Sequence, residues 1–146
     1  MNLNFRIERK KCMKAKILII DDSGDFRAQV KDYLKMHDPA IEIFEASTAE
    51  MGVAKASCVR PDIVLMDIHL PHGNGLEATR HIKEENPDCD VIVLTMLDVE
   101  AFRQAAKNVA VTDFIGKSEI YERLMPSIER CLDRKTIKGG GNYEKK

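Results

Sequence analysis

Five short apolar runs recur along the 146-residue sequence, and longer stretches with helical periodicity separate them. The first, third and fourth runs are almost continuously apolar and rich in Ile and Val, which is typical of parallel strands covered on both faces. Each run has the length of a single strand. The runs cover residues 16–21, 41–46, 62–67, 90–95 and 112–115.

The stretches between and after the runs place apolar side chains on one helical face. Pro126 lies inside the last of these patterns, so we expect either a kink there or a later helix start. The clearest stripes are Phe26, Val30, Tyr33, Leu34 and His37, then Val99, Phe102, Ala106 and Val109, and finally Ile120, Leu124, Ile128 and Leu132.

A strand–helix unit repeated five times, with short connections, predicts one α/β domain with a parallel sheet and helices on both faces. Two strand orders are compatible with this pattern. In the flavodoxin-like order, 2-1-3-4-5, the carboxyl ends of the first and third strands are neighbours at the topological switch point, where ligands bind. We expect the folded domain at residues 15–134, with flexible segments at 1–14 and 135–146, the latter containing three consecutive glycines.

The overall composition excludes some classes of function. The 23 basic and 24 acidic residues give a net charge of -1, so no global field attracts nucleic acid or an anionic membrane. The four cysteines lie far apart without zinc-site spacing, which indicates reduced thiols. Because no apolar stretch of membrane-spanning length and no signal peptide is visible, we predict a cytoplasmic protein without membrane contact.

Three acids close two of the apolar runs. Asp21 and Asp22 end the first run, and Asp67 ends the third. If these strands are neighbours, three carboxylates meet at one edge of the sheet and repel one another unless a hard cation lies among them. A few carboxylates beside open water positions suit Mg²⁺. A single acid would be explained by a turn or a helix cap, but a doublet with a third acid favours the metal.

A hydroxyl and an ammonium follow at the same edge, because Thr95 ends the fourth run and Lys117 follows the fifth. Together with the acids they indicate a phosphoryl-binding site built around a carboxylate nucleophile. Asp67 can attack phosphorus, while the metal and Lys117 offset charge on the phosphoryl oxygens. Thr95 can donate a hydrogen bond to one of those oxygens. Each residue alone is ordinary, and their joint placement carries the hypothesis.

This set of residues resembles the receiver domains of response regulators in bacterial two-component systems. The resemblance covers about residues 15–133. It implies a flavodoxin-like (βα)5 fold with strand order 2-1-3-4-5, and a regulatory phosphoacceptor rather than an enzyme. The residues that carry it are Asp21, Asp22, Asp67, Thr95 and Lys117, with Leu70, Pro71, Gly75 and Phe114 in agreement.

The resemblance implies a role for each residue of the site. Asp67 is expected to accept the phosphoryl group, Asp22 to bind Mg²⁺ directly, and Asp21 to bind it through water. The backbone carbonyl of His69 is expected to be the remaining protein ligand. The expected donor is a phosphohistidine on a sensor histidine kinase or a phosphotransfer protein, with small phosphodonors as substitutes.

The resemblance also implies a conformational switch. Thr95 is expected to move toward the phosphoryl group, and Phe114 to swing inward into the vacated space. A downstream protein partner is then expected to read the face formed by the fourth helix, fifth strand and fifth helix. This face comprises residues 99–108, 112–115 and 119–132, and a homodimer on phosphorylation is one outcome of the change.

Two departures from the family pattern affect loops at the site. Ser118 stands where many receivers have a proline after the lysine, which affects the geometry of that loop. Ala110 and Val111 stand before the fifth strand where many relatives have glycine and alanine. His69 and Leu97 occupy positions that tune phosphoryl lifetime in the family.

Rival interpretations make different demands on the sequence. A Mg²⁺-dependent phosphohydrolase with an aspartyl nucleophile needs a second acid two residues after Asp67, where this chain has His69. A flavin-binding flavodoxin needs a loop rich in hydroxyls and glycine after the first strand, where Asp21 and Asp22 stand. Within the receiver class, three forms compete: a stand-alone regulator, the receiver part of a truncated helix-turn-helix transcription regulator, and a receiver that signals without phosphorylation. We expect no DNA binding from these residues themselves.

Overall fold

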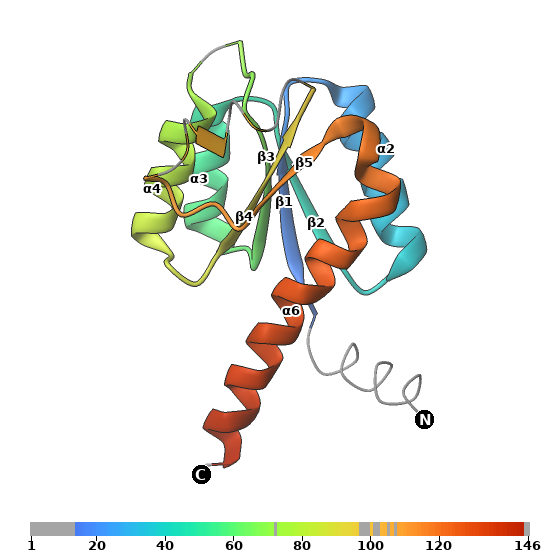
Figure 1. The fold of residues 1–146 in the computed structure, drawn as a ribbon, viewed down its shortest axis with the longest axis vertical. Coiled ribbons are helices and arrows are strands. Elements are labelled where there is room, and N and C mark those ends of the chain that lie inside the picture. The colour runs from blue at the N-terminus through green and yellow to red at the C-terminus, as the bar shows by residue number, and fades with distance from the viewer. Residues whose placement is uncertain are drawn as a thin grey trace.

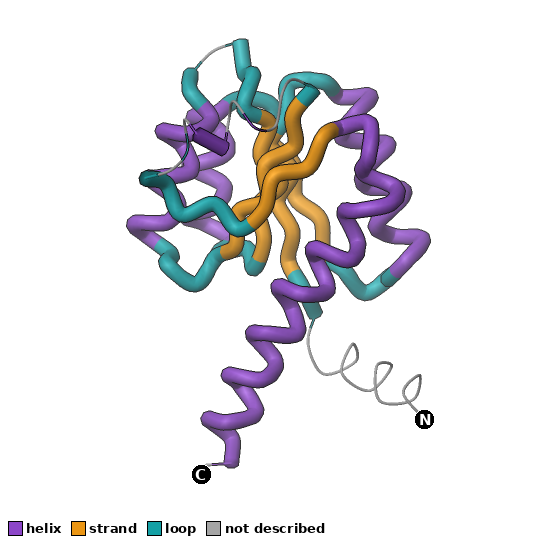
Figure 2. The backbone as a smooth tube through the Cα atoms, viewed as in Figure 1, coloured by secondary structure: helices purple, strands orange, loops and turns teal. Residues whose placement is uncertain are grey.

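Five parallel strands form one sheet in the order β2-β1-β3-β4-β5, which confirms the predicted flavodoxin-like topology (Figures 1 and 2). The computed structural model describes residues 14–71, 73–96, 100, 103–104, 106 and 108–144, with only the helical backbone described for residues 136–144. The strands are β1 (Lys16–Ile20), β2 (Glu42–Ala46), β3 (Ile63–Asp67), β4 (Asp90–Thr95) and β5 (Asp113–Gly116).

Helices cover both faces of the sheet, with α3 and α4 on one face and α2 and α6 on the other (Figure 1). Side-chain oxygens cap the amino ends of the first three: that of Ser23 accepts from the Phe26 N–H, and Thr48 and Asn74 cap α3 and α4 in the same way. The described helices are α2 (Gly24–His37), α3 (Ala49–Val59), α4 (Gly75–Glu85), the 3₁₀ turn η1 (Lys117–Glu119) and α6 (Ile120–Glu144).

Successive residues of each strand point to opposite faces of the sheet, and this alternation divides the core in two. Because full burial of one Ile or Leu side chain contributes about 1.5–3 kcal/mol, both clusters are large stabilising terms. The cluster under α2 and α6 includes Ile17, Ile19, Ile63, Leu65, Ile92, Leu94 and Ile115. The cluster under α3 and α4 includes Leu18, Ile20, Val64, Met66 and Val91.

The predicted strand limits agree with the structure to within one residue. β1 stops at Ile20 rather than Asp21, because Asp21 turns its carboxylate back to accept the Ser23 N–H at 2.8 Å. β5 lies one residue later than predicted, at Asp113–Gly116. Val99 and Phe102, two members of the predicted helical stripe that also contains Ala106 and Val109, lie outside the described residues.

The last helix begins earlier and extends further than the sequence suggests. α6 starts at Ile120 and includes Pro126, so the prediction of a later start is wrong. Its backbone stays helical past residue 134 and through the glycines at 139–141, within the segment that we expected to be a flexible tail. The domain limits at 15 and 134 and the flexibility of the tail stay predictions, and residues 1–13 lie outside the described residues.

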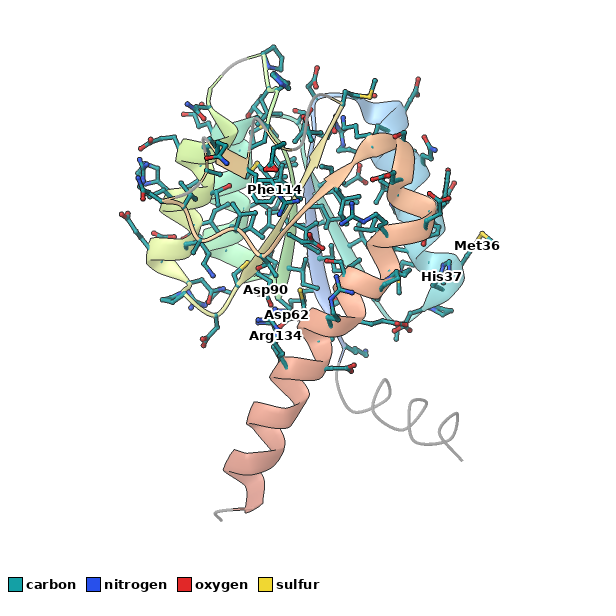
Figure 3. The ribbon with its side chains drawn as sticks, in the orientation of Figure 1. Met36, His37, Asp62, Asp90, Phe114 and Arg134 are labelled. Atoms are coloured by element: carbon teal, nitrogen blue, oxygen red, sulfur yellow. The ribbon has the colours of Figure 1, made fainter. Side chains whose placement is uncertain are left out.

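Ion pairs fasten α6 to the amino edge of the sheet, opposite the carboxyl ends of the strands. The guanidinium of Arg134 lies 3.1 Å from Asp90 Oδ1, and Lys135 Nζ lies 3.7 Å from Asp90 Oδ2. Figure 3 shows Asp62, Asp90 and Arg134 gathered at this edge. Among the described helices, none combines the length and apolar character needed to cross a membrane.

The contact between α3 and β1 leaves no room for a side chain at Gly52. A Cβ built on Gly52 would lie 2.4 Å from Ile20 Cδ1 and 2.9 Å from Ile20 Cγ1. We therefore predict that Gly52→Ala destabilises the protein, because overpacking costs about 1–3 kcal/mol and outweighs the gain of about 1 kcal/mol from replacing a helical glycine. Urea unfolding measures the change.

Gly24→Ala is the matched control for this substitution. Gly24 also lies in a helix, but the atom nearest to its built Cβ is an Arg27 nitrogen at 3.6 Å, an ordinary contact distance. The control is expected to be neutral or slightly stabilising. If Gly52→Ala stabilises the protein as much as the control does, the close packing of α3 on β1 is not a constraint.

Candidate functional site

The register of neighbouring strands brings three carboxylates together. Ile20 of β1 pairs with Met66 of β3, so the residues that follow, Asp21 and Asp67, lie side by side at the carboxyl edge. Asp22 follows directly, and each of the three acids offers a ligand atom within 4.8 Å of the others. The structure therefore places together the three acids that the sequence predicted to meet.

Two of these acids are buried and held by tight turns. Asp21 is 1% exposed and Asp67 5% exposed, whereas Asp22 is exposed. Each buried acid accepts a backbone N–H from two residues further on: Asp21 Oδ1 from Ser23 at 2.8 Å, and Asp67 Oδ1 from His69 at 2.9 Å. These bonds fix one oxygen of each carboxylate in a turn.

The side chain of Lys117 bridges the two buried acids. It starts from the 3₁₀ turn after β5, and its ammonium lies 2.7 Å from Asp21 Oδ2 and 3.6 Å from Asp67 Oδ2. The lysine is itself largely covered, with 11% of its side chain exposed. A buried carboxylate without such a partner would be strongly destabilising, so the ammonium compensates the crowding of negative charge.

Burial raises the pKa of the Asp67 carboxyl above its ordinary value of 3.8. Loss of water contact is the main cause, because it disfavours the charged form. The His69 N–H and the Lys117 ammonium act in the opposite direction, while the neighbouring charges of Asp21 and Asp22 raise the pKa further. A cation placed among the three acids would reverse this balance.

A hard divalent cation fits the chemistry of this donor set. Three carboxylates converge, one of them on the solvent-exposed side, and all offer oxygen atoms. Mg²⁺ is bound in proteins through one or two carboxylates with water and phosphate oxygens in the remaining positions. The three acids are therefore suited to hold the ion. The ligand role of the His69 backbone carbonyl stays a prediction. The His69 residue itself is exposed.

Thr95 and Phe114 lie on the other side of the sheet from the buried carboxylates. Thr95, the fully buried end of β4, is in register with Gly116, and Phe114 pairs with Val93. Because residues two apart share a face, Thr95 and Phe114 point to the same side. The Phe114 ring is 6% exposed and packs in a cluster with Ile68, Val93 and Ala106 (Figure 3). The predicted inward swing would thus begin from a ring that is already buried.

Two further residues, Phe26 and Arg27, contact the site. The sequence predicted only a core role for Phe26 and no role for Arg27. The Phe26 ring lies under the Lys117 ammonium, with 4.2 Å between Nζ and the ring centroid. Arg27 donates to the backbone carbonyl of Asp21 at 2.6 Å, and Glu45 holds this guanidinium at 2.9 Å. Their position in the sequence could have indicated this contact, because both lie in the first turn of the helix that follows Asp21 and Asp22.

Close packing of the backbone also shapes the acceptor loop. A Cβ at Gly75 would lie 2.8 Å from the Asp67 carbonyl oxygen and 3.0 Å from Ile68 Cα, so only glycine fits at the start of α4. At the lysine, residues 117–119 form a 3₁₀ turn, and the described residues contain no cis peptide bond. Leu97 lies outside the described residues.

The sequence of residues 17–129 matches the response regulator receiver domain family. Because this match covers most of the chain, the protein belongs to that family and is a receiver domain of two-component signalling. Among curated relatives, the protein-glutamate methylesterase/protein-glutamine glutaminase of Alkalilimnicola ehrlichii is 34% identical over 88% of this chain and 34% of its own length. The transcriptional regulatory protein DegU of Brevibacillus brevis is 31% identical over 89% of this chain and 52% of its own length.

The chain thus spans about a third to a half of the length of these two relatives. Solved structures give the same family. A LuxR-family two-component response regulator from Aurantimonas sp. SI85-9A1 is 30% identical with a TM-score of 0.75, over 83% of this chain and 86% of that one. A CheY-like receiver domain protein from Methanospirillum hungatei JF-1 is 25% identical with a TM-score of 0.79, over 86% of this chain and 99% of that one.

We predict that Asp67→Asn stabilises the metal-free protein at neutral pH. Because the pKa of folded Asp67 is raised, the folded state binds more protons than the unfolded state in the pH range between the ordinary pKa of 3.8 and the raised pKa. The free energy of unfolding of the wild type therefore falls as the pH rises through the folded pKa. The variant has no proton to lose at this position, so its advantage should be absent at low pH and grow toward neutrality.

Urea unfolding in the presence of a chelator measures the difference in free energy of unfolding between the variant and the wild type. The pH range of about 3.5 to 7.5 extends from the ordinary carboxyl pKa to neutrality. Asp32→Asn removes an exposed carboxylate on α2 and serves as the control. Its profile should run parallel to that of the wild type. A variant Asp67→Asn that is less stable than the wild type at neutral pH would show that burial does not dominate at this carboxyl.

Proposed function

We propose that this receiver domain accepts a phosphoryl group on Asp67 in a Mg²⁺-dependent reaction, with a phosphohistidine of a sensor histidine kinase or phosphotransfer protein as the donor. The observation that supports the proposal most directly is the convergence of Asp21, Asp22 and Asp67 within 4.8 Å beside the Lys117 ammonium. This combination offers a nucleophile, an oxygen-rich cation site and a positive charge at one buried position.

The proposed reaction is a direct phosphoryl transfer between the donor and the acceptor carboxylate. An Asp67 oxygen attacks phosphorus, the phosphorus–nitrogen bond to the donor imidazole breaks, and the bonding electrons stay on the imidazole. When bound, Mg²⁺ neutralises charge on the phosphoryl oxygens and on the acids. Lys117 contributes a second positive charge, and the Thr95 hydroxyl donates to a phosphoryl oxygen. Water later attacks phosphorus, the bond between phosphorus and the Asp67 oxygen breaks, and inorganic phosphate leaves as the carboxylate is restored.

Asp22 and the backbone carbonyl of His69 are the proposed direct protein ligands of the ion, and Asp21 the ligand through water. Asp67 contributes an oxygen of its own. The exposure of Asp22 supports a direct role, because its carboxylate can reorient at little cost. The ion pair between Asp21 and Lys117 supports the more distant role of Asp21, whose Oδ2 atom already has a strong partner.

Phosphorylation adds charge beside Thr95 and is proposed to change the face read by a partner. In this proposal Phe114 connects Thr95 to the partner-binding face, because it lies on the same side of the sheet as Thr95, on the neighbouring strand β5. The Arg103 guanidinium carbon lies 5.1 Å from the Phe114 ring centroid, so a shift of this ring would move a surface charge. Of the proposed face, residues 99, 101–102, 105 and 107 lie outside the described residues.

The output of the switch is a downstream protein partner or an attached output domain, and a phosphorylation-dependent homodimer through the same face is part of the proposal. The relative DegU, a transcriptional regulatory protein of which this chain spans 52%, supports the alternative that this is the receiver part of a transcription regulator. We propose that the present residues bind no DNA themselves, act in the cytoplasm, and have no enzymatic role beyond assisting their own phosphorylation and dephosphorylation.

We predict that the wild type, incubated with Mg²⁺ and a small phosphodonor such as acetyl phosphate, gains one phosphoryl group that intact mass spectrometry detects. The adduct should require Mg²⁺, should be labile in alkali as an acyl phosphate is, and should be absent from Asp67→Asn. Absence of the adduct from the wild type, both with this donor and with a panel of sensor kinases, would overturn the proposal.

The same assay separates the rival functions. A phosphohydrolase would release phosphate from an added phosphomonoester catalytically, whereas a receiver forms a stoichiometric adduct. A receiver that signals by binding alone would form no adduct but would still bind its partner after Asp67→Asn. These outcomes differ in phosphate released per protein molecule and in adduct mass.

We predict that Lys117→Gln raises the affinity for Mg²⁺ several-fold. The ammonium occupies Asp21 Oδ2 and repels a second cation at short range, so its removal frees an oxygen and removes that repulsion. Isothermal titration measures the dissociation constant. Lys31→Gln is the control, because Lys31 is an exposed lysine that pairs with Glu45 at 3.7 Å rather than with the acids. Equal affinities in wild type and Lys117→Gln would contradict the prediction.

A further inference from the structure

The Lys117 ammonium has an uncharged partner as well as its two carboxylates. Its Nζ lies 4.2 Å from the centroid of the Phe26 ring, within the range of about 6 Å over which an aromatic face attracts a cation. The lysine side chain is 11% exposed, so little water screens this attraction. The ammonium is therefore attracted by Asp21, Asp67 and Phe26 together.

Phe26 is anchored through both its backbone and its partly buried side chain. Its backbone N–H donates to Ser23 Oγ at 3.1 Å, which caps α2, and its side chain packs against the core cluster under α2 and α6. Ser23 in turn donates its N–H to Asp21, so the acidic loop, the cap and the ring form one connected unit. A long, flexible lysine side chain thus meets a ring that packs against the core.

The two charged partners of Lys117 are not permanent in the proposed reaction. Cation binding among the three acids competes with the ammonium for Asp21, and phosphoryl transfer turns one Asp67 oxygen into a bond to phosphorus. The Phe26 ring has no lone pair for a hard cation and takes no part in either change. It is the partner of Lys117 that stays the same throughout the reaction.

We propose that Phe26 is a positioning residue for phosphoryl transfer: its aromatic face keeps the Lys117 ammonium beside Asp67 while the lysine exchanges its carboxylate partner for a phosphoryl oxygen. The proposal rests on the proposed function, because it concerns the same phosphoryl transfer. It adds the first turn of α2 to the parts of the chain on which that transfer depends.

The test is the rate of adduct formation with acetyl phosphate at saturating Mg²⁺, measured by intact mass. Phe26→Leu should slow the reaction about two- to thirty-fold, the range that corresponds to a cation–aromatic contact, whereas Phe26→Tyr, which keeps the ring, should restore the rate. In a Lys117→Gln background, Phe26→Leu should have no further effect, because the ring then has no ammonium to hold.

Phe44→Leu is the matched control for lost aromatic packing. Phe44 is a partly buried phenylalanine on β2 that packs against the cluster under α3 and α4, on the other face of the sheet. Its substitution should leave the rate of adduct formation unchanged. If Phe26→Leu reacts as fast as the wild type, or slows the reaction equally with and without Lys117, the positioning role is wrong.

Urea unfolding without phosphodonor tests the contact between the ring and the ammonium. The four proteins compared are the wild type, Phe26→Leu, Lys117→Gln and the variant with both substitutions. The shift in midpoint caused by Phe26→Leu should be larger with Lys117 present than in the Lys117→Gln background, because only the former loses the attraction. Equal shifts would overturn the contact. A wild type that forms no adduct would instead overturn the proposed function, so the two failures are distinguishable.

Discussion

The ion pair between Lys117 and Asp21 makes the crowded carboxyl edge of the sheet compatible with a folded protein. Neighbouring parallel strands place Asp21 and Asp67 side by side in a buried position, where two carboxylates without a cation would repel each other strongly. The ammonium, 2.7 Å from Asp21 and 3.6 Å from Asp67, offsets part of that repulsion. The pKa of Asp67 is nevertheless raised, mainly because burial disfavours its charged form and to a lesser degree because Asp21 and Asp22 are close. A divalent cation among the three acids would stabilise their charged forms.

The fold followed from the sequence because its two main determinants are local and repeated. Runs such as residues 63–66 are apolar at every position, which requires a helix on each face of the sheet. Parallel strands joined by helices then allow few topologies. The positions of the acids could also be predicted, because residues at the carboxyl ends of parallel strands all lie at the same edge of the sheet. Asp21 and Asp67 needed the strand order to be known, and the family resemblance supplied it.

The contacts of Phe26 and Arg27 could not be predicted in this way. They depend on how α2 is rotated about its axis and on what packs beside it, and the periodicity of the sequence does not determine either. Phe26 fits the apolar stripe of α2, yet its position in the first turn brings its ring to Lys117 as well as to the core. Arg27 is polar and next to it, and only the tertiary structure aims its guanidinium at the Asp21 carbonyl. In α6, three glycines predict an end to the helix, and nothing in the structure explains why the backbone stays helical through them.

The sheet separates the two halves of the proposed switch. Asp67, Lys117 and Phe26 lie on the side of α2 and α6, whereas Thr95 and Phe114 point to the side of α3 and α4. The proposed output face spans both sides, because residues 120–132 belong to α6 on the side of Asp67, whereas Phe114 points to the other side. A change at Asp67 thus reaches α6 without crossing the sheet, and reaches Phe114 only past Thr95 at the carboxyl edge of the sheet.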